Sequence, residues 1–412
     1  MSTISAPGTD APAAQVPDYP MPRATGCPFD PPPALGALQA RTPLSRVRLW
    51  DGSTPWLITR YEDVRALLAD PRLSSESSHP HYPHTSPAMK ERRRQSQTFI
   101  NMDDPEHARL RRMVTAAFSV KKVEALRPAV QKIVDGLIDA MLAGPKPVDL
   151  VRAFALPVPS LVICELLGVP YAEHEFFQDG SKILIKRTTT TEQARAATRR
   201  LIDYLDRLIG VKLAHPADDL LSTLSERVRA GDISRREAAD MGMLLLIAGH
   251  ETTANMIALG TLALLQNPDQ LARLRESGDP KLVASAVEEL LRYLSIVHSG
   301  RRRVALEDIE IGGTTIRAGD GIVLANDIGN RDPAAFPDPD RLDVGRNPRH
   351  HVAFGFGVHQ CLGQPLARVE LQVVYGTLYR RIPTLRPAVD LDRITFKHDG
   401  NVYGVYELPV TW

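Results

Sequence analysis

Apolar residues recur at helical spacing along most of the chain. Between residues 105 and 294 they return every three or four positions, which indicates helices with one buried face. The stretch 241–265 is the most apolar of these and is predicted to be a long buried helix. Helices are predicted over about 61–69, 105–118, 121–143, 158–168, 171–186, 192–214, 233–266, 268–276, 280–294 and 363–382.

Strand patterns are short and lie toward the two ends of the chain. Residues 47–50 and 55–59 flank Asp51-Gly52, a favoured hairpin turn. Alternation of apolar and polar residues predicts further strands at 304–311, 314–317, 321–325, 393–397 and 402–411. Residues 74–97 lack a period and are predicted to form a long loop, and the proline-rich stretch 332–350 is predicted to be irregular. The fold class is therefore mainly α with small β-sheets.

Length and charge narrow the class of protein. The 412 residues suit one large domain over 29–412, preceded by a poorly ordered tail over 1–28. Lys and Arg number 50 and Asp and Glu 49, which argues against a nucleic-acid-binding protein. The sequence has neither a secretory signal of the usual form nor an apolar run long enough to span a membrane. We expect a soluble, cytoplasmic monomer.

The chain has three cysteines, Cys27, Cys164 and Cys361. A number this small, and odd, argues against a disulfide framework. Cys27 and Cys164 are best explained as ordinary thiols. Cys361 differs because it follows Phe354-Gly355-Phe356-Gly357-Val358-His359-Gln360 and precedes a predicted helix. Free amides and the helix dipole are expected there to lower the pKa of the thiol and to favour the thiolate that binds a soft metal.

Two neighbours of Cys361 extend this prediction. Gly363 would let a flat group lie close to the backbone, and His359 could donate to an anionic group near the metal. Zinc is disfavoured because the chain has no CxxC pair.

The centre of the predicted long helix carries Ala248-Gly249-His250-Glu251-Thr252-Thr253. Glycine and threonine weaken a helix, and a threonine can bond back to a carbonyl one turn earlier. Small residues at 248 and 249 would leave room for a flat ligand or O2. The alternatives are a packed helix with a tolerated kink and a metalloprotease helix, but the latter needs a second histidine where Ala254 stands.

Two further pairs share a helix face. Glu289 and Arg292 are three apart, and His107 and Arg111 are four apart. Taken alone, the first is an ordinary ion pair and the second an ordinary basic face.

Together, residues 104–111, 248–253, 289–292 and 354–363 resemble the motifs of the cytochrome P450 family, whose cysteine loop is F-G-x-G-x-H-x-C-x-G. In finer detail the chain is similar to soluble actinobacterial members of secondary metabolism or xenobiotic oxidation. The resemblance implies the P450 fold, with haem b between the 241–265 helix and the cysteine loop. It also implies that Cys361 is the axial thiolate ligand of the haem iron.

The resemblance implies roles for further residues. Thr252 would hydrogen-bond oxygen at the iron, and Glu251 would relay protons. Glu289 and Arg292 would form a structural ion pair whose third partner is Arg341 or Arg346. The expected haem contacts are His107, Arg111, Arg303, His359, Phe354, Gly355, Ala248 and Gly363, whereas Arg301 and Arg302 match no family position. The expected substrate pocket, bordered by 74–100 and 183–192, contains Met243, Leu244, Ile247, Ala248, Ile296, Val297, His298, Val402 and Tyr403.

The implied reaction is monooxygenation of a medium-to-large hydrophobic molecule. Because the haem domain fills the chain, electrons from NAD(P)H would arrive through an external ferredoxin and its reductase. Arg112, Arg349 and His350 are expected to dock that acidic partner. The run 186–191 could meet an acidic or polyol tail of the substrate, or could be an ordinary solvated loop.

Two other classes of protein are alternatives to a monooxygenase. A peroxide-using or non-oxygenating thiolate-haem enzyme is disfavoured by the intact Glu251-Thr252 pair. A haem sensor or carrier would usually have a linked output module, and the sequence suggests none.

Overall fold

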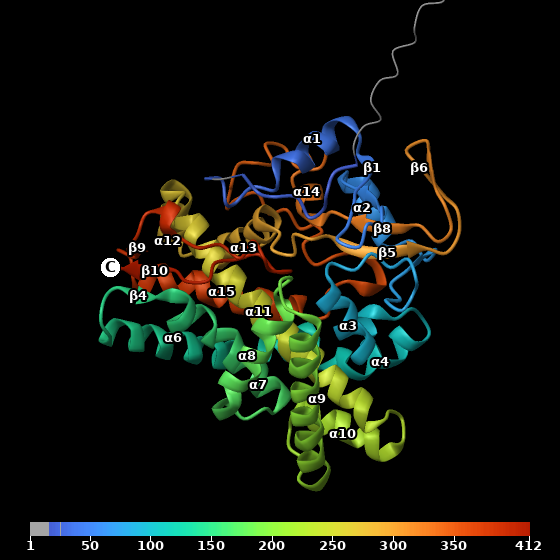
Figure 1. Cartoon of the computed structure of the whole chain (residues 1–412). Helices are drawn as coiled ribbons and strands as arrows, with labels where there is room; N and C mark the ends of the chain where they lie inside the picture. The colour runs from blue at the N-terminus through green and yellow to red at the C-terminus, as the bar shows by residue number, and fades with distance from the viewer. Residues whose placement is uncertain (1–15, 25) are drawn as a thin grey trace, which may run out of the picture.

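Helix α11 (Arg235–Leu265) runs through the middle of the computed structural model, which describes residues 16–24 and 26–412 (Figure 1). Its first turn is closed by a capping box, in which Ser234 accepts from the Glu237 amide and the Glu237 side chain accepts from the Ser234 amide. Nearly every residue from Ala238 to Leu264 is buried. The helix is therefore covered on all sides, as its uniformly apolar sequence indicates.

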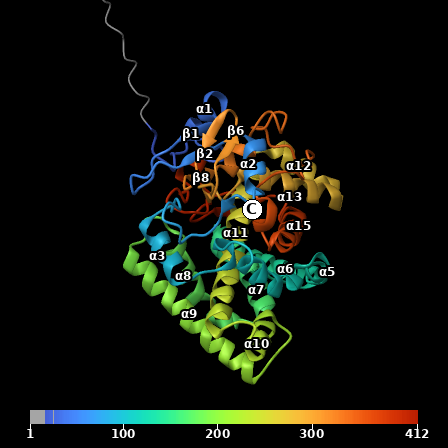
Figure 2. The same cartoon turned by 90° about the vertical axis from the view of Figure 1, so that its right-hand side faces the viewer.

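Helices α7 (Pro157–Leu167), α9 (Thr191–Ala214) and α15 (Gln364–Arg381) pack directly on α11. Figures 1 and 2 show α9 and α10 at one end of the molecule and the main sheet with α1 and α2 at the other. The other helices are α1 (Pro33–Arg41), α2 (Tyr61–Leu68), α3 (Pro87–Gln95), α4 (Glu106–Thr115), α5 (Val120–Ala125), α6 (Arg127–Ala143), α8 (His174–Ile185), α10 (Leu220–Ala230), α12 (Pro268–Ser277), α13 (Pro280–Leu294) and α14 (Asn326–Gly329).

The β structure is small and forms three sheets in the described part of the chain. The largest has the order β1 (Leu44–Arg46), β2 (Trp56–Ile58), β8 (Gly321–Leu324), β5 (Arg301–Ala305), β3 (Leu73–Ser74), with β2 and β8 parallel and the other pairs antiparallel. A second joins β4 (Val148–Asp149), β10 (Pro409–Thr411) and β9 (Arg386–Pro387), and a third pairs β6 (Ile309–Ile311) with β7 (Thr314–Ile316). The mainly α class with small sheets is confirmed.

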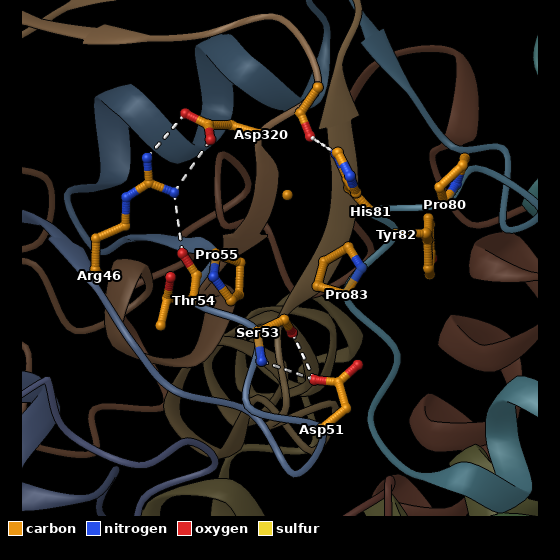
Figure 3. Close-up of a pocket in the computed structure, with 12 residues that line it drawn as sticks. Arg46, Asp51, Ser53, Thr54, Pro55, Pro80, His81, Tyr82, Pro83 and Asp320 are labelled. Carbon is orange, nitrogen blue, oxygen red and sulfur yellow. Dashed lines mark hydrogen bonds and ion pairs between the residues drawn. The ribbon is translucent and has the colours of Figure 1, made fainter.

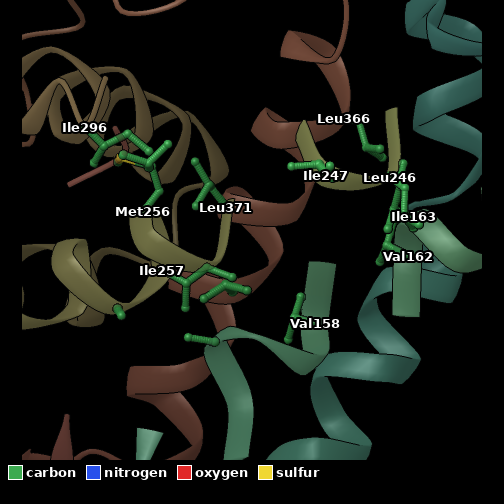
Figure 4. Packing of buried hydrophobic residues seen from close by; sticks show 14 of the residues in the cluster. Val158, Val162, Ile163, Leu246, Ile247, Met256, Ile257, Ile296, Leu366 and Leu371 are labelled. Atoms are coloured by element: carbon green, nitrogen blue, oxygen red, sulfur yellow. The ribbon is translucent and has the colours of Figure 1, made fainter. Parts of the chain in front are cut away.

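The apolar core around α11 depends on close helix contacts, several of which Figure 4 shows between α7, α11 and α15. Gly249 lies where α7 approaches α11, and a Cβ at this position would come within 2.7 Å of Ile163 Cγ1. The absence of a side chain at 249 therefore serves helix packing. The expectation that both small residues make room for a ligand is wrong for Gly249, whereas Ala248 remains exposed.

Four helices were not predicted: α1, α3, α10 and the short α14. Helix α3 lies within the predicted loop 74–97, capped by the Ser86 hydroxyl, which accepts from the Met89 amide at 3.2 Å. Its run of arginines hides the helical period, and its contact with α9 is made by Ala88 and Glu91. Helix α10 lies between predicted helices and is capped by Asp219.

Several element boundaries differ from the predictions. The hairpin forms around Asp51-Gly52, but its first regular strand ends at Arg46 because Pro55 has no amide hydrogen to donate back to Val47. The predicted helix 121–143 divides into α5 and α6 at Pro128, and the predicted strand 304–311 divides into β5 and β6. Of the predicted C-terminal strands, only β10 is regular, and Phe396 and Val405 form a single bridge.

The N-terminal segment departs from the predicted tail over 1–28. Residues 1–15 and 25 lie outside the described residues. Residues 16–24, in contrast, follow the main sheet: Asp18 forms a parallel bridge with Arg48, and Tyr19 and Met21 are buried in a cluster with Val47 and Leu57. Among the described helices, none is both long and apolar enough to cross a bilayer.

Candidate functional site

The cysteine loop ends three residues before α15 and is held by its own backbone. The Cys361 amide donates to the Phe354 carbonyl at 2.9 Å, and Gly355 and Gly357 adopt φ angles of +73° and +76°, which only glycine tolerates easily. Cys361 and Gly363 are half-buried, and a Cβ added at Gly363 would meet no protein atom within 4 Å. The loop therefore leaves Cys361 partly exposed, and the space beside Gly363 is open to a flat group.

Burial raises the pKa of the Cys361 thiol above its ordinary value in the protein alone. The positive charges of Arg301, Arg111 and Arg368 and the Gly363 amide act in the opposite direction without outweighing burial. The expected net lowering of this pKa by the helix terminus is therefore not found. Cys164 is buried, and its thiol pKa is raised to about 12, while Cys27 is exposed.

Apart from its two ends, the accessible part of α11 is confined to its centre. Between Ala238 and Leu264 the residues that are not buried are Ala248, Gly249 and Thr252. Ala248 and Thr252 are one helical turn apart and share a face. The Thr252 hydroxyl donates to the Ala248 carbonyl at 2.7 Å, which leaves the Thr252 Oγ1 lone pairs free to accept.

Glu251 points away from this face into a buried polar cluster. Burial would raise the pKa of Glu251, but the adjacent His250 and the charges of Lys397 and Lys182 hold it below its usual value. Lys397 Nζ donates to Asn255 Oδ1 at 2.9 Å. The lowered pKa favours the ionised Glu251 carboxylate, and the charge of the half-buried Lys397 contributes to this. The sequence pattern did not reveal this connection because Lys397 lies 146 positions away.

The four side chains expected at the haem edge lie close together in the structure. The rings of His107 and His359 lie 4.2 Å apart, and His107 Nε2 and His359 Nδ1 have no hydrogen-bond partner. Arg111 Nη2 donates to the Gln360 carbonyl at 2.6 Å. Burial, together with the charges of Arg303, His107 and Arg111, lowers the pKa of His359 to about 3.

Such a concentration of positive charge and unpartnered ring nitrogens fits a ligand that carries carboxylates. Haem has two propionates, an iron that takes a thiolate, and a flat ring. The residues present therefore fit haem, with Cys361 at the iron and His107, Arg111, Arg303 and His359 at the propionates.

The Glu289–Arg292 pair is fully buried and bidentate. Arg292 Nε and Nη2 donate to the two Glu289 oxygens at 2.8 Å each, and Arg292 Nη1 donates to the carbonyls of Asn330 and Pro339. Of the two expected third partners, the structure selects Arg346, whose Nε donates to Glu289 Oε1 at 3.1 Å. Arg341 is exposed and lies 3.9 Å from Asp343 instead. The network joins α13 to the irregular stretch before the cysteine loop.

A second buried carboxylate was missed by the sequence argument. Glu288 accepts from Arg368 of α15 at 2.6 and 3.0 Å and contacts His351 Nε2 at 3.1 Å. Burial would raise the pKa of Glu288, but these two partners outweigh it and lower the pKa to about 2. The guanidinium of Arg368 also lies 4.7 Å from the centre of the Phe354 ring. His351 thus ties α13 to the cysteine loop and α15.

The expected substrate-pocket residues are unequal in accessibility. Ala248 is exposed and Val297 is half-buried, whereas Met243 and Tyr403 have almost no accessible surface. The Tyr403 amide donates to the Ile296 carbonyl at 2.8 Å, which places the C-terminal hairpin beside the segment after α13. Tyr403 therefore packs behind the surface of the expected pocket and does not itself line that surface. The remaining members, Leu244, Ile247, Ile296, His298 and Val402, are each less than a tenth exposed.

Figure 3 shows a separate hollow of about 250 Å³ between the N-terminal hairpin and residues 80–83. Its charged residues Arg46 and Asp320 pair with each other at 2.9 Å, and Trp56 Nε1 donates to the same carboxylate at 2.8 Å. Neither the cysteine loop nor α11 lines it. Because its charges are satisfied internally, it is not a candidate active site.

Comparisons with known proteins agree with this arrangement. The family model described as Cytochrome P450 matches residues 174–383. Cytochrome P450 GfsF of Streptomyces halstedii is 58% identical over 403 residues, which cover 97% of each chain. The crystal structure of GfsF superposes with a TM-score of 0.91, at 59% identity, over 96% of this chain and 100% of that one.

A second protein is more distant in sequence but similarly close in fold. The mycinamicin VIII C21 methyl hydroxylase MycCI of Micromonospora griseorubida, solved with mycinamicin VIII bound, is 43% identical and superposes with a TM-score of 0.90. The superposition covers 96% of this chain and 100% of that one.

Proposed function

The chain belongs to the cytochrome P450 family, and from this premise we propose that it is a haem-thiolate monooxygenase acting on a medium-to-large hydrophobic molecule. The reaction would insert one oxygen atom of O2: RH + O2 + 2e− + 2H+ gives ROH + H2O. The observation that carries the proposal is that Cys361, in a loop with the family's spacing, and the Ala248–Thr252 face of α11 are both at least partly exposed, although α11 is otherwise buried between residues 238 and 264.

Cys361 would hold the haem iron through its sulfur, and His107, Arg111, Arg303 and His359 would neutralise the two propionates. When bound, haem with a thiolate ligand supplies O2 activation and favours O–O cleavage. The protein's own contribution is to hold the group, to exclude water around it and to deliver protons.

Proton delivery is assigned to Thr252 and Glu251. The Thr252 proton is engaged with the Ala248 carbonyl, so Oγ1 can accept a hydrogen bond from a donor in the pocket. Glu251, kept ionised by its cationic neighbours, can take up a proton from the Lys397 side and pass it toward Thr252. Both groups act through oxygen atoms on successive residues of α11.

Electrons are proposed to come from an external ferredoxin and its NAD(P)H-dependent reductase. Arg112, Arg349 and His350 are exposed and supply positive charge or hydrogen-bond donors for an acidic partner. Arg112→Glu is expected to slow reduction by the ferredoxin at low salt, whereas Arg386→Glu on β9, across the molecule from α4 in Figure 1, should not. Equal rates in both variants would refute this docking site.

The substrate is proposed to be a natural product, a sterol-like molecule or a xenobiotic compound. The apolar character of Leu244, Ile247, Ile296 and Val402 supports a hydrophobic ligand. The similar MycCI was solved with mycinamicin VIII bound.

The proposed function is tested by turnover with surrogate ferredoxin and reductase and isotopically labelled O2, using the compound that gives the largest spectral shift in a ligand screen. The expected product carries one labelled oxygen atom. Thr252→Ala should consume NADPH at a similar rate but release peroxide in place of product. Thr223→Ala is the matched control, because its hydroxyl makes the same bond to a carbonyl one turn earlier on exposed α10. Full coupling in Thr252→Ala would contradict the assigned role.

A further inference from the structure

Strand β5 begins with three consecutive arginines, of which one remains without a role. Successive side chains in a strand point to opposite faces of the sheet. The positive charge of Arg303 lowers the pKa of His359, and the positive charge of Arg301 favours the thiolate form of Cys361. Both arginines therefore belong to the haem side of β5. Arg302 lies on the other face, where its positive charge acts to lower the pKa of Tyr19 and of His84.

The guanidinium of Arg302 has one edge without a partner. Arg302 is 7% exposed, and its Nη1 donates to the Gly300 carbonyl at 3.2 Å. Nε and Nη2 are buried and have no hydrogen-bond partner. A buried donor left unpaired costs free energy, and more so when it is charged.

This edge has the geometry that binds carboxylates elsewhere in the same protein. Arg292 uses Nε and Nη2 to hold Glu289 at 2.8 Å each, and Arg72 uses the same two nitrogens to hold Asp70 at 3.0 and 2.7 Å. Two parallel N–H groups match the two oxygens of a carboxylate. Arg302 therefore presents a ready bidentate site for an anion.

No carboxylate is among the groups that act most strongly on Arg302. Burial lowers the pKa of Arg302 to about 10, and the groups that act on it most are Tyr19, Tyr82, Arg93 and Arg187. Two of these are tyrosines and two are further cations, although Asp399 partly offsets the charge of Arg187.

The two neighbouring arginines are satisfied by neutral groups. Arg93 Nη1 donates to the Tyr82 hydroxyl at 2.8 Å and to Asn101 Oδ1 at 2.5 Å. Arg187 Nη1 donates to the Gly400 carbonyl at 3.1 Å. Their charges therefore remain available to attract an anion to Arg302.

Arg23 shows that the situation of Arg302 is unusual. Nε and Nη2 of Arg23 also lack a hydrogen-bond partner, but the negative charge of Asp327 raises the pKa of Arg23. Both carboxylate oxygens of Asp327 are themselves without a hydrogen-bond partner. Arg23 therefore has a carboxylate within the protein to balance it, whereas Arg302 has none among its strongest neighbours.

The location of Arg302 connects this site with the substrate. Tyr82 and Arg93 belong to the segment 74–100, and Arg187 belongs to the turn 183–192, the two segments expected to border the substrate pocket. Groups from both segments therefore act on Arg302.

We propose that the substrate carries a carboxylate, bound in a bidentate pair by Nε and Nη2 of Arg302, with Arg93 and Arg187 adding positive potential. This inference rests on the proposed monooxygenase function, because it places the carboxylate at the end of the substrate away from the haem.

The test is a spectral titration of the haem-loaded enzyme with pairs of ligands that differ only in charge: dodecanoate, biphenyl-4-carboxylate and deoxycholate, each against its methyl ester. We expect at least one acid to bind more tightly than its ester. In Arg302→Gln that acid should lose about tenfold to a hundredfold in affinity, while its ester changes less than about twofold. Arg94→Gln, an exposed arginine on α3 whose removal changes the net charge equally, is the control and should keep the preference.

Arg302→Lys separates geometry from charge, because lysine keeps the charge but lacks the two parallel donors. An intermediate affinity for the acid is expected. Equal binding of acid and ester in every pair, or a preference that survives in Arg302→Gln, would overturn the proposal. The reduced CO spectrum of each variant is recorded in parallel. A normal thiolate spectrum without an acid preference refutes only the carboxylate site, whereas an abnormal spectrum in the wild type refutes the proposed function.

Discussion

Replacing Glu289 by glutamine removes the one negative charge of a fully buried ion network. Glu289 accepts from Arg292 at 2.8 Å twice, from Arg346 at 3.1 Å and from the Asp343 amide at 3.0 Å. The variant leaves the fully buried Arg292 guanidinium without its counter-charge. Breaking a buried pair from one side costs about 3–5 kcal/mol. Since domains are stable by only about 5–15 kcal/mol, Glu289→Gln should lose a large part of the folding free energy and with it haem retention.

The assay is denaturant unfolding of the haem-loaded protein, followed by haem absorbance and far-ultraviolet circular dichroism. Glu276→Gln is the control, because Glu276 also pairs with an arginine, Arg275 at 3.4 Å, but its side chain is 70% exposed. The control should change the free energy of unfolding by less than about 0.5 kcal/mol. A loss of less than about 1 kcal/mol in Glu289→Gln would show that the network does not stabilise the approach to the cysteine loop.

Three further predictions concern α11 and its neighbours. Gly249→Val puts a Cβ 2.7 Å from Ile163 Cγ1 and should cost about 1–3 kcal/mol in denaturant unfolding; an unchanged midpoint would contradict the packing role. Burial raises the pKa of Glu370 from 4.5 to about 8, so wild-type stability should fall by up to about 5 kcal/mol as pH rises through this range. Glu370→Gln should abolish this fall, which is measured as the denaturant midpoint of unfolding at several pH values. A fall of equal size in the variant would refute the role of Glu370. The pKa of Glu251 is lowered overall, because neighbouring groups that include Lys397 outweigh the effect of burial. Lys397→Gln should therefore raise this pKa and move the acidic limb of the pH–activity profile to higher pH. An unmoved limb would exclude Lys397 from proton delivery.

The sequence was most informative where chemistry and local spacing coincide. The loop before Cys361 carries its own backbone requirements in Gly355 and Gly357, and the structure gives both positive φ angles. The pair Glu289 and Arg292 meets because i, i+3 neighbours share a helix face. Such features depend on few residues and are therefore visible without a fold.

Features that depend on distant segments were not visible in the same way. Spacing could not choose between Arg341 and Arg346, because the choice depends on how an irregular stretch folds back on α13. The lowered thiol pKa expected for Cys361 was wrong because burial, which sequence does not reveal, outweighs the helix terminus. Helix α3 was missed because its arginines mask the period, and its burial comes from contact with α9.

The central claim, that Cys361 holds haem iron as a thiolate, is tested most directly by the absorbance of the reduced, CO-bound protein. The account predicts the long-wavelength band at about 450 nm that gives the family its number, and its loss in Cys361→Ser with the fold retained by circular dichroism. An unshifted band in Cys361→Ser, or a histidine-type spectrum in freshly prepared wild-type protein, would contradict it.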